Sequence, residues 1–99
     1  MVEIQEFSEM KEGLDYKYYV NGQWKISESG NTISVRNPYN DELVGNVQAC
    51  TKDEVDHVMK VARENVDCWR ETPIGERAKI LRKAARLIVQ WSDHLGNVL

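Results

Sequence analysis

The 99-residue sequence has few of the features that mark several large classes of protein. It contains two cysteines, Cys50 and Cys68, which form no CxxC pair, and no secretory signal precedes them. Two such cysteines do not make a disulfide framework. His57 and His94 do not stand at metal-ligand spacing from either cysteine, so the sequence predicts no metal site.

Long apolar runs are also missing. No run approaches the roughly 18 residues of a membrane-spanning helix, and the acidic start lacks the Arg-rich character of a transit peptide. The formal net charge of −3 gives the whole chain no electrostatic reason to bind nucleic acid or anionic lipid. We therefore expect a cytoplasmic protein with no nucleic-acid partner and no membrane partner.

Catalytic motifs are equally scarce. The glycines are isolated and form no phosphate-binding loop, and no Ser-His-Asp arrangement has support from spacing. Cys50 stands before a helix start, where the helix dipole would lower a thiol pKa; we favour a small residue at a strand-to-helix junction instead. Cys68 is interpreted as a packing residue after a helix end, and His57 is expected on the solvated side of its helix.

Positive charge is concentrated between residues 70 and 86, whereas acidic residues dominate the first sixteen. A basic helix can contact phosphates in a nucleic-acid binder, but no aromatic residues are interleaved with this one. We therefore favour a solvated helix face with a few ion pairs. Trp24, Trp69 and Trp91 could form a platform for a cofactor or sugar, but their places at element edges favour anchoring in a core.

The first half of the chain begins with a weakly patterned arm and a clear hairpin signal. Residues 1–16 are predicted as an N-terminal arm, for which a short helix, a draped segment and a poorly ordered terminus are all open. Next, residues 18–20 and 23–26 flank Asn21-Gly22, the pair that best tolerates positive φ at both central positions of a type I′ turn.

Two further extended pieces follow the hairpin. Residues 32–35 alternate polar and apolar side chains, and Asn37-Pro38 ends this strand because proline cannot donate to a sheet. Residues 43–47 form the next strand, in which Gly45 indicates a bulge or a close approach of another backbone.

Two helices are predicted next. Thr51 and Glu54 form a capping box that opens a helix over about 52–67, and Trp69 is expected to pack under its end. Thr72 as N-cap and Pro73 at the first helical position open a second helix that continues to Leu99. Each helix carries an apolar stripe, formed by Val55, Val58, Met59, Ala62 and Val66 in the first and by Leu81, Ala84, Ala85, Ile88, Trp91 and Leu95 in the second.

This ordered series resembles the start of an aldehyde dehydrogenase of the NAD(P)-dependent superfamily. Members of that family open with an NG hairpin that ends in tryptophan, like residues 19–24, and continue with a strand that runs into Asn-Pro, like residues 35–38. Their next two helices are matched by Val55-Asp56, Trp69-Arg70, Pro73, Glu76-Arg77-Ala78, Leu81 and Ala84-Ala85. The stretches YYVNGQWKIS and YNDELVGNV are similar to the non-phosphorylating glyceraldehyde-3-phosphate dehydrogenase branch.

The resemblance implies an α+β fragment, in which an N-terminal β-hairpin and strands precede two helices. Residues 17–99 would form the outer, incomplete part of an α/β Rossmann-like nucleotide-binding domain. In the family, the catalytic cysteine, the general-base glutamate, the oxyanion-hole asparagine and the dinucleotide-binding segments all come later in the sequence. Some members bind a monovalent cation through backbone carbonyls at positions matched by Val35 and Arg36. We assign no catalytic, cofactor-binding or metal-binding residue within this chain.

The resemblance also implies the activity of a longer parent protein. In the family, a thiolate attacks an aldehyde, the thiohemiacetal passes hydride to the nicotinamide, and water activated by glutamate releases the acid. The 99 residues alone are expected to be inactive and to bind neither NAD nor NADP. Their partners would be the remainder of the polypeptide and, in full length, further copies in a dimer or tetramer. The alternative is a freestanding protein-interaction or assembly module without catalysis.

Overall fold

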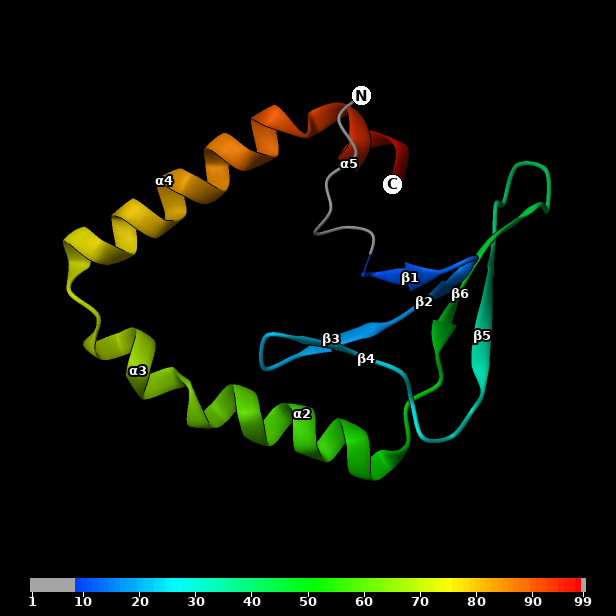
Figure 1. Ribbon diagram of the computed structural model, residues 1–99, viewed down its shortest axis with the longest axis horizontal. Coiled ribbons are helices and arrows are strands. Elements are labelled where there is room, and N and C mark those ends of the chain that lie inside the picture. Colours follow the sequence, from blue (N-terminus) through cyan, green and yellow to red (C-terminus); the bar gives the residue numbers. More distant parts are fainter. Residues whose placement is uncertain (1–8, 99) are drawn as a thin grey trace. The chain divides into compact units, whose positions relative to one another are not determined.

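The computed structural model describes residues 9–98, and the chain divides into two compact units between Glu64 and Asn65. The first unit holds the strands and helix α2 (Lys52–Glu64), and the second holds helices α3 (Val66–Glu71), α4 (Ile74–Gln90) and α5 (Ser92–Val98) (Figure 1). The predicted order of strands followed by helices is confirmed.

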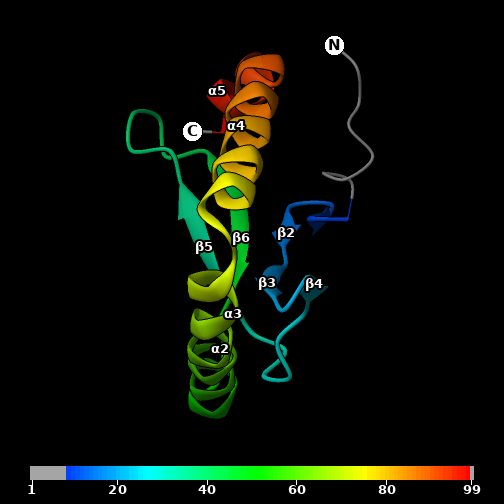
Figure 2. The same cartoon turned by 90° about the vertical axis from the view of Figure 1, so that its left-hand side faces the viewer.

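The larger sheet has four strands in the order β1-β2-β6-β5. Its longest pair, β5 and β6, is antiparallel, with Ile33 opposite Val47, and these two strands run side by side in both ribbon views (Figures 1 and 2). β2 joins β6 in parallel, with Asp15 opposite Asn46. The strands are β1 (Lys11–Glu12), β2 (Asp15–Tyr16), β5 (Thr32–Arg36) and β6 (Leu43–Gln48).

The short strands β1 and β2 show that the helical alternative for the N-terminal arm is wrong at these residues. A helix was open for residues 1–16, but residues 11–12 and 15–16 are extended, and residues 1–8 lie outside the described residues. Gly13 adopts a φ of 58°, which reverses the chain between the two strands. Pairing of β2 with β6 then outweighs the weak helical spacing of the apolar residues. The domain division between residues 16 and 17 stays a prediction.

The predicted hairpin forms a separate two-stranded sheet of β3 (Tyr18–Val20) and β4 (Gln23–Lys25). Asn21 and Gly22 have φ values of 50° and 77°, which confirms the type I′ signature of positive φ at both turn positions. The rings of Tyr19 and Trp24 meet edge to face with their centroids 4.9 Å apart. Val20 is 5% exposed and is the buried apolar side chain among residues 9–97.

Gly45 marks both a bulge and a close approach, as predicted. Val35 pairs with Gly45 and Arg36 pairs with Leu43, so Val44 is an extra residue in β6. A Cβ atom on Gly45 would lie 2.7 Å from Cε2 of Tyr16 and 3.1 Å from the carbonyl oxygen of Leu14. The absence of a side chain at this position therefore allows the segment around β2 to lie directly against β6.

The first predicted helix is interrupted. α2 ends at Glu64 rather than near residue 67, and Asn65 has φ −93° and ψ −2°. Asparagine is a weak helix former because its side chain competes for backbone hydrogen bonds, and this explains a break at that residue. Cys68 and Trp69 consequently lie inside α3 and not after a helix end. Both are exposed, so the predictions that they pack in a core are wrong.

The second predicted helix begins one residue later than expected and is also interrupted. Pro73 takes the N-cap place, its carbonyl accepts from the N–H of Arg77 at 3.0 Å, and Thr72 instead donates its hydroxyl to the carbonyl of Cys68 at 2.8 Å. The extended backbone of Thr72 is the conformation that a following proline imposes. The helix breaks at Trp91, which has φ −109° and ψ 21°, and α5 begins at Ser92.

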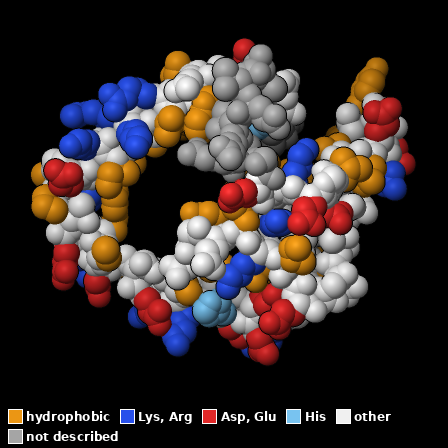
Figure 3. All heavy atoms as spheres, viewed as in Figure 1, with side chains coloured by type: hydrophobic (Ala, Val, Ile, Leu, Met, Phe, Trp, Pro, Cys, Tyr) orange, Lys and Arg blue, Asp and Glu red, His pale blue; other side chains and the backbone are white. Residues whose placement is uncertain are grey.

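The residues of the predicted apolar stripes lie on helices, but their side chains are not buried. No residue of α2, α3 or α4 is buried, and Met59 and Leu81 are 66% and 62% exposed. Apolar side chains are visible at the surface along the helices in Figure 3. Within the described residues, no helix has the length and apolar character needed to cross a membrane.

We expect Gly22→Val to destabilise the first unit by about 1–3 kcal/mol, because a β-branched residue resists the positive φ of this turn. Gly22→Asn is the matched control, since asparagine tolerates the left-handed region. Urea unfolding followed by tryptophan fluorescence measures both variants. Equal unfolding midpoints for Gly22→Val and the parent chain would contradict the importance of this turn.

Candidate functional site

The carboxylate of Glu54, in the first turn of α2, accepts four hydrogen bonds. It accepts hydrogen bonds from the hydroxyl of Ser27 at 2.6 Å and from the hydroxyl of Tyr18 at 3.2 Å. It also accepts from the backbone N–H groups of Thr51 at 2.9 Å and Glu28 at 3.1 Å. We refer to these five residues as the Glu54 cluster. It joins β3, the loop after β4 and the start of α2.

Part of the Glu54 cluster is the capping box that the sequence predicted. The N–H of Glu54 donates to Oγ1 of Thr51 at 3.2 Å, and Oε1 of Glu54 accepts from the N–H of Thr51. This reciprocal pair satisfies backbone donors that a helix start leaves without partners. The contacts from Tyr18, Ser27 and Glu28 were not predicted, because they join segments more than twenty residues apart.

Hydrogen bonding sets the ionisation of the cluster. The Ser27 hydroxyl and then the Thr51 N–H are the main causes that lower the pKa of Glu54 to about 2, while burial opposes them. Burial and the Glu54 carboxylate raise the pKa of Tyr18. Burial and the Glu54 carboxylate also raise the pKa of Cys50. A thiol activated at the helix start is therefore contradicted, and the preferred interpretation of Cys50 as a junction residue stands.

Ser27 extends the cluster to the larger sheet. It is 4% exposed, and its hydroxyl has one proton, which we assign to Glu54 because charged acceptors form the stronger and shorter bonds. Its N–H donates to Oε1 of Gln48 at 2.9 Å, and Nε2 of Gln48 donates to the carbonyl of Tyr16 at 2.9 Å. Ser29 closes the loop by donating to the carbonyl of Ala49 at 2.7 Å.

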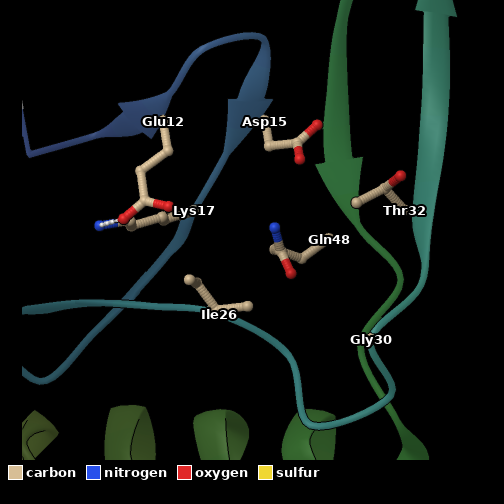
Figure 4. Close-up of a pocket in the computed structure, with 7 residues that line it drawn as sticks. All are labelled: Glu12, Asp15, Lys17, Ile26, Gly30, Thr32 and Gln48. Carbon is tan, nitrogen blue, oxygen red and sulfur yellow. Dashed lines mark ion pairs between the residues drawn. The ribbon is translucent and has the colours of Figure 1, made fainter.

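A small cavity of about 120 Å³ lies beside this network and is shown in Figure 4. Its charged and amide groups already have partners. Glu12 pairs with Lys17 at 3.5 Å, Asp15 accepts from Nδ2 of Asn46 at 2.8 Å, and both ends of the Gln48 amide are bonded. Ligand sites usually have about 300–1,000 Å³ and a few convergent polar groups. We therefore assign no substrate to this cavity, which Ile26, Gly30 and Thr32 also line.

A wider, open depression of about 520 Å³ lies over the Glu54 cluster itself. Its polar floor is formed by Tyr18 and Glu54, which are bonded to each other. His57, which also lines the depression, is exposed on α2 as expected. A carboxylate with a pKa of about 2 and four donors is a poor proton acceptor near neutral pH. The arrangement suits structural support and not acid–base catalysis.

The remaining candidates from the sequence do not converge. Among residues 9–98, no three His, Cys, Asp or Glu residues lie where they could hold a metal ion. His94 is half-buried in α5, and Val35 and Arg36 end β5 with no cation site assigned. Trp24 and Trp91 are half-buried. In Figure 3 the basic side chains gather over α4, where four of them are exposed: Lys79, Arg82, Lys83 and Arg86.

The described residues do not fit a nicotinamide dinucleotide. Its pyrophosphate needs free N–H groups at a helix start, usually after closely spaced glycines. At α2 the N–H groups of Thr51 and Glu54 are used by the capping box, and the first turn carries the negative charges of Asp53 and Glu54. At α4 the cap is Pro73, which has no N–H, and Glu76 lies in the first turn.

We expect Glu54→Gln to speed amide hydrogen exchange of Glu28 and Thr51 by roughly tenfold, because both N–H groups lose a charged acceptor. Asp53→Asn is the matched control, since it removes a neighbouring exposed charge without touching the cluster. The measurement is hydrogen exchange resolved by NMR. Equal exchange rates in the two variants would show that the Glu54 carboxylate does not hold the loop.

Comparison with known proteins identifies the group to which these elements belong. Residues 24–99 match the aldehyde dehydrogenase family. The NADP-dependent glyceraldehyde-3-phosphate dehydrogenase of Arabidopsis thaliana is 42% identical over 82 residues, which cover 83% of this chain and 16% of that protein. The protein of the same name in Nicotiana plumbaginifolia is 42% identical over 93 residues, covering 94% of this chain and 19% of the relative.

A bacterial relative extends the comparison. Malonate-semialdehyde dehydrogenase 2 of Geobacillus kaustophilus is 36% identical over 83 residues, covering 84% of this chain and 17% of that protein. No solved structure matches the chain. The chain therefore spans less than a fifth of the length of these relatives. On the family match over residues 24–99, the chain belongs to the aldehyde dehydrogenase family.

Proposed function

We propose that these residues are the N-terminal part of an enzyme that oxidises an aldehyde to a carboxylic acid or acyl product with NADP+ or NAD+. The family match over residues 24–99 carries this proposal. The order of the NG hairpin, the Asn-Pro strand end and the capped helix supports placement at the start of the enzyme. Two relatives named as NADP-dependent glyceraldehyde-3-phosphate dehydrogenases favour NADP and that branch of the family.

The proposed role of the segment is architectural. Its first unit is held together by the Glu54 cluster, which orients the start of α2 relative to the hairpin β3–β4. α2 and α4 then present apolar side chains such as Met59 and Leu81 to solvent. Exposed apolar surface of this kind usually marks an interaction site. Later parts of the same polypeptide are the proposed partner, and assembly of the full-length enzyme into a homo-oligomer is part of the proposal.

Neither candidate for direct chemistry supports catalysis by this segment. Catalytic cysteines work as thiolates, and the raised pKa of Cys50 keeps that side chain as a thiol near neutral pH. Cys68 is exposed on α3, and its substitution by serine is part of the test below. The carboxylate of Glu54 is occupied by four donors. We propose that the nucleophile, the general base and the cofactor site lie outside these residues.

The second candidate function is a freestanding interaction module. The same exposed apolar side chains favour it, because a module that binds another protein also needs uncovered surface. The two proposals differ in what covers that surface. The rest of an aldehyde dehydrogenase should do so under the first, and an unrelated protein under the second.

We expect the purified chain to show no aldehyde oxidation with NAD+ or NADP+ above a buffer control. Absorbance of the reduced nicotinamide measures turnover, with glyceraldehyde 3-phosphate as the first substrate. Cys50→Ser and Cys68→Ser are the controls. Turnover that either substitution abolishes would contradict the proposal that this segment lacks the nucleophile.

A chimera tests the architectural role directly. The matching segment of the Arabidopsis thaliana relative is replaced by residues 17–99, and NADP-dependent turnover is measured together with solubility. We expect activity within about tenfold of the parent enzyme, because the catalytic groups are unchanged. A soluble chain that fails to support activity in the chimera would favour the freestanding module.

A further inference from the structure

We propose that Asn21 is a site of spontaneous deamidation and that opening of the hairpin β3–β4 controls its rate. The sequence contains seven asparagines, and Asn21 alone is followed by glycine. Gly22 has no side chain to shield its backbone nitrogen, whereas the other asparagines precede Thr, Pro, Asp or Val. Asn21 and Gly22 are both exposed at the tip of the hairpin, so water reaches the site. The inference is independent of the proposed function.

The reaction needs no reagent other than water. The backbone nitrogen of Gly22 loses its proton and attacks Cγ of Asn21, and the bond from Cγ to the side-chain nitrogen breaks as ammonia leaves. The product is a five-membered succinimide. Water then opens this ring at Cγ to give aspartate, or at the main-chain carbonyl to give isoaspartate. The net change is the addition of one water and the loss of one ammonia, with no oxidation.

The folded turn opposes this ring closure. Asn21 has a φ of 50°, in the left-handed region, where ψ lies at about +30° to +60°. To bring Cγ onto the nitrogen of Gly22, the chain must rotate about the Cα–C bond of Asn21 and leave that region. The type I′ turn holds this bond in place while Val20 stays paired with Gln23. Deamidation must therefore wait for the hairpin to open.

The energy of opening depends on the base of the hairpin. A two-stranded sheet is marginal in isolation, and here it is supported by the Tyr19–Trp24 ring contact. At the base, Tyr18 donates to Glu54, and the loop that follows β4 is bound to the same carboxylate through Ser27 and Glu28. Loss of the Glu54 contacts should increase the open fraction, and with it the rate at Asn21.

The two products have different effects on the hairpin. Aspartate tolerates positive φ and keeps the turn, while it adds one negative charge to an acidic chain. Isoaspartate inserts one extra carbon into the backbone, which is incompatible with the pairing of Tyr19 with Trp24 across a two-residue turn. Isoaspartate therefore disrupts the pairing of β3 with β4. The amount of product that accumulates at Asn21 depends on how often the hairpin opens.

The test follows conversion at Asn21 by peptide mapping that separates aspartate from isoaspartate. The folded 99-residue chain and the same chain in urea are incubated side by side at mildly alkaline pH. We expect measurable conversion at Asn21 in the folded chain, about tenfold slower than in urea. The other six asparagines serve as internal controls and should convert more slowly.

Variants of the base of the hairpin test the control by opening. Tyr18→Phe keeps the ring and removes one bond to Glu54, and Glu54→Gln weakens all of them. Both should speed conversion in the folded chain and leave the rate in urea unchanged, while Asp53→Asn should change neither. Circular dichroism establishes whether each variant is folded. If Glu54→Gln does not fold, Tyr18→Phe alone provides the test.

Three results would overturn the proposal. Equal rates in the folded chain and in urea would show that the turn does not control the reaction. An unconverted Asn21 in the folded chain, once the urea sample has fully converted, would show that the folded protein does not use the site. Unchanged rates of conversion in folded Tyr18→Phe and Glu54→Gln would show that the Glu54 cluster does not control opening of the hairpin.

Discussion

A single ionised carboxylate, that of Glu54, joins the parts of the first unit. Helix starts leave N–H groups without partners, and the capping box of Thr51 and Glu54 satisfies two of them. The same carboxylate also accepts from Tyr18, Ser27 and Glu28, which belong to segments far away in the sequence. Hydrogen bonds to a charged acceptor are stronger than neutral ones, so a small unit with few buried apolar side chains depends on this group.

The features that the sequence predicted correctly are local ones. Asn21-Gly22 specifies its turn through the φ values of two adjacent residues, and the capping box spans four. The breaks at Asn65 and Trp91 were not predicted because the helical spacing of apolar residues continues through both positions. Each helix ends before its apolar pattern does. Strands β1 and β2 were not predicted because the extended conformation of this segment depends on the pairing of β2 with β6, about thirty residues later in the sequence.

The candidate site was predicted only in part for the same reason. Thr51 and Glu54 are three positions apart, so their pairing is visible in the sequence. Strands β5 and β6 lie between Ser27 and Glu54 in the sequence, and no periodic pattern marks the contact of these two residues. The family could still be recognised from the sequence, because its recognition depends on the order of several local signals and not on one site.

The donors around Glu54 hold its carboxylate ionised, and an NMR titration of the side-chain carbon of Glu54 tests this directly. The donors lower the folded-state pKa from 4.5 to about 2. A lowered pKa contributes stability that is fully present above the ordinary value and is lost as pH falls through the folded value. We expect a midpoint near 2, accompanied by loss of the amide protection of Glu28 and Thr51. A midpoint near 4.5 with the first unit still folded would contradict it.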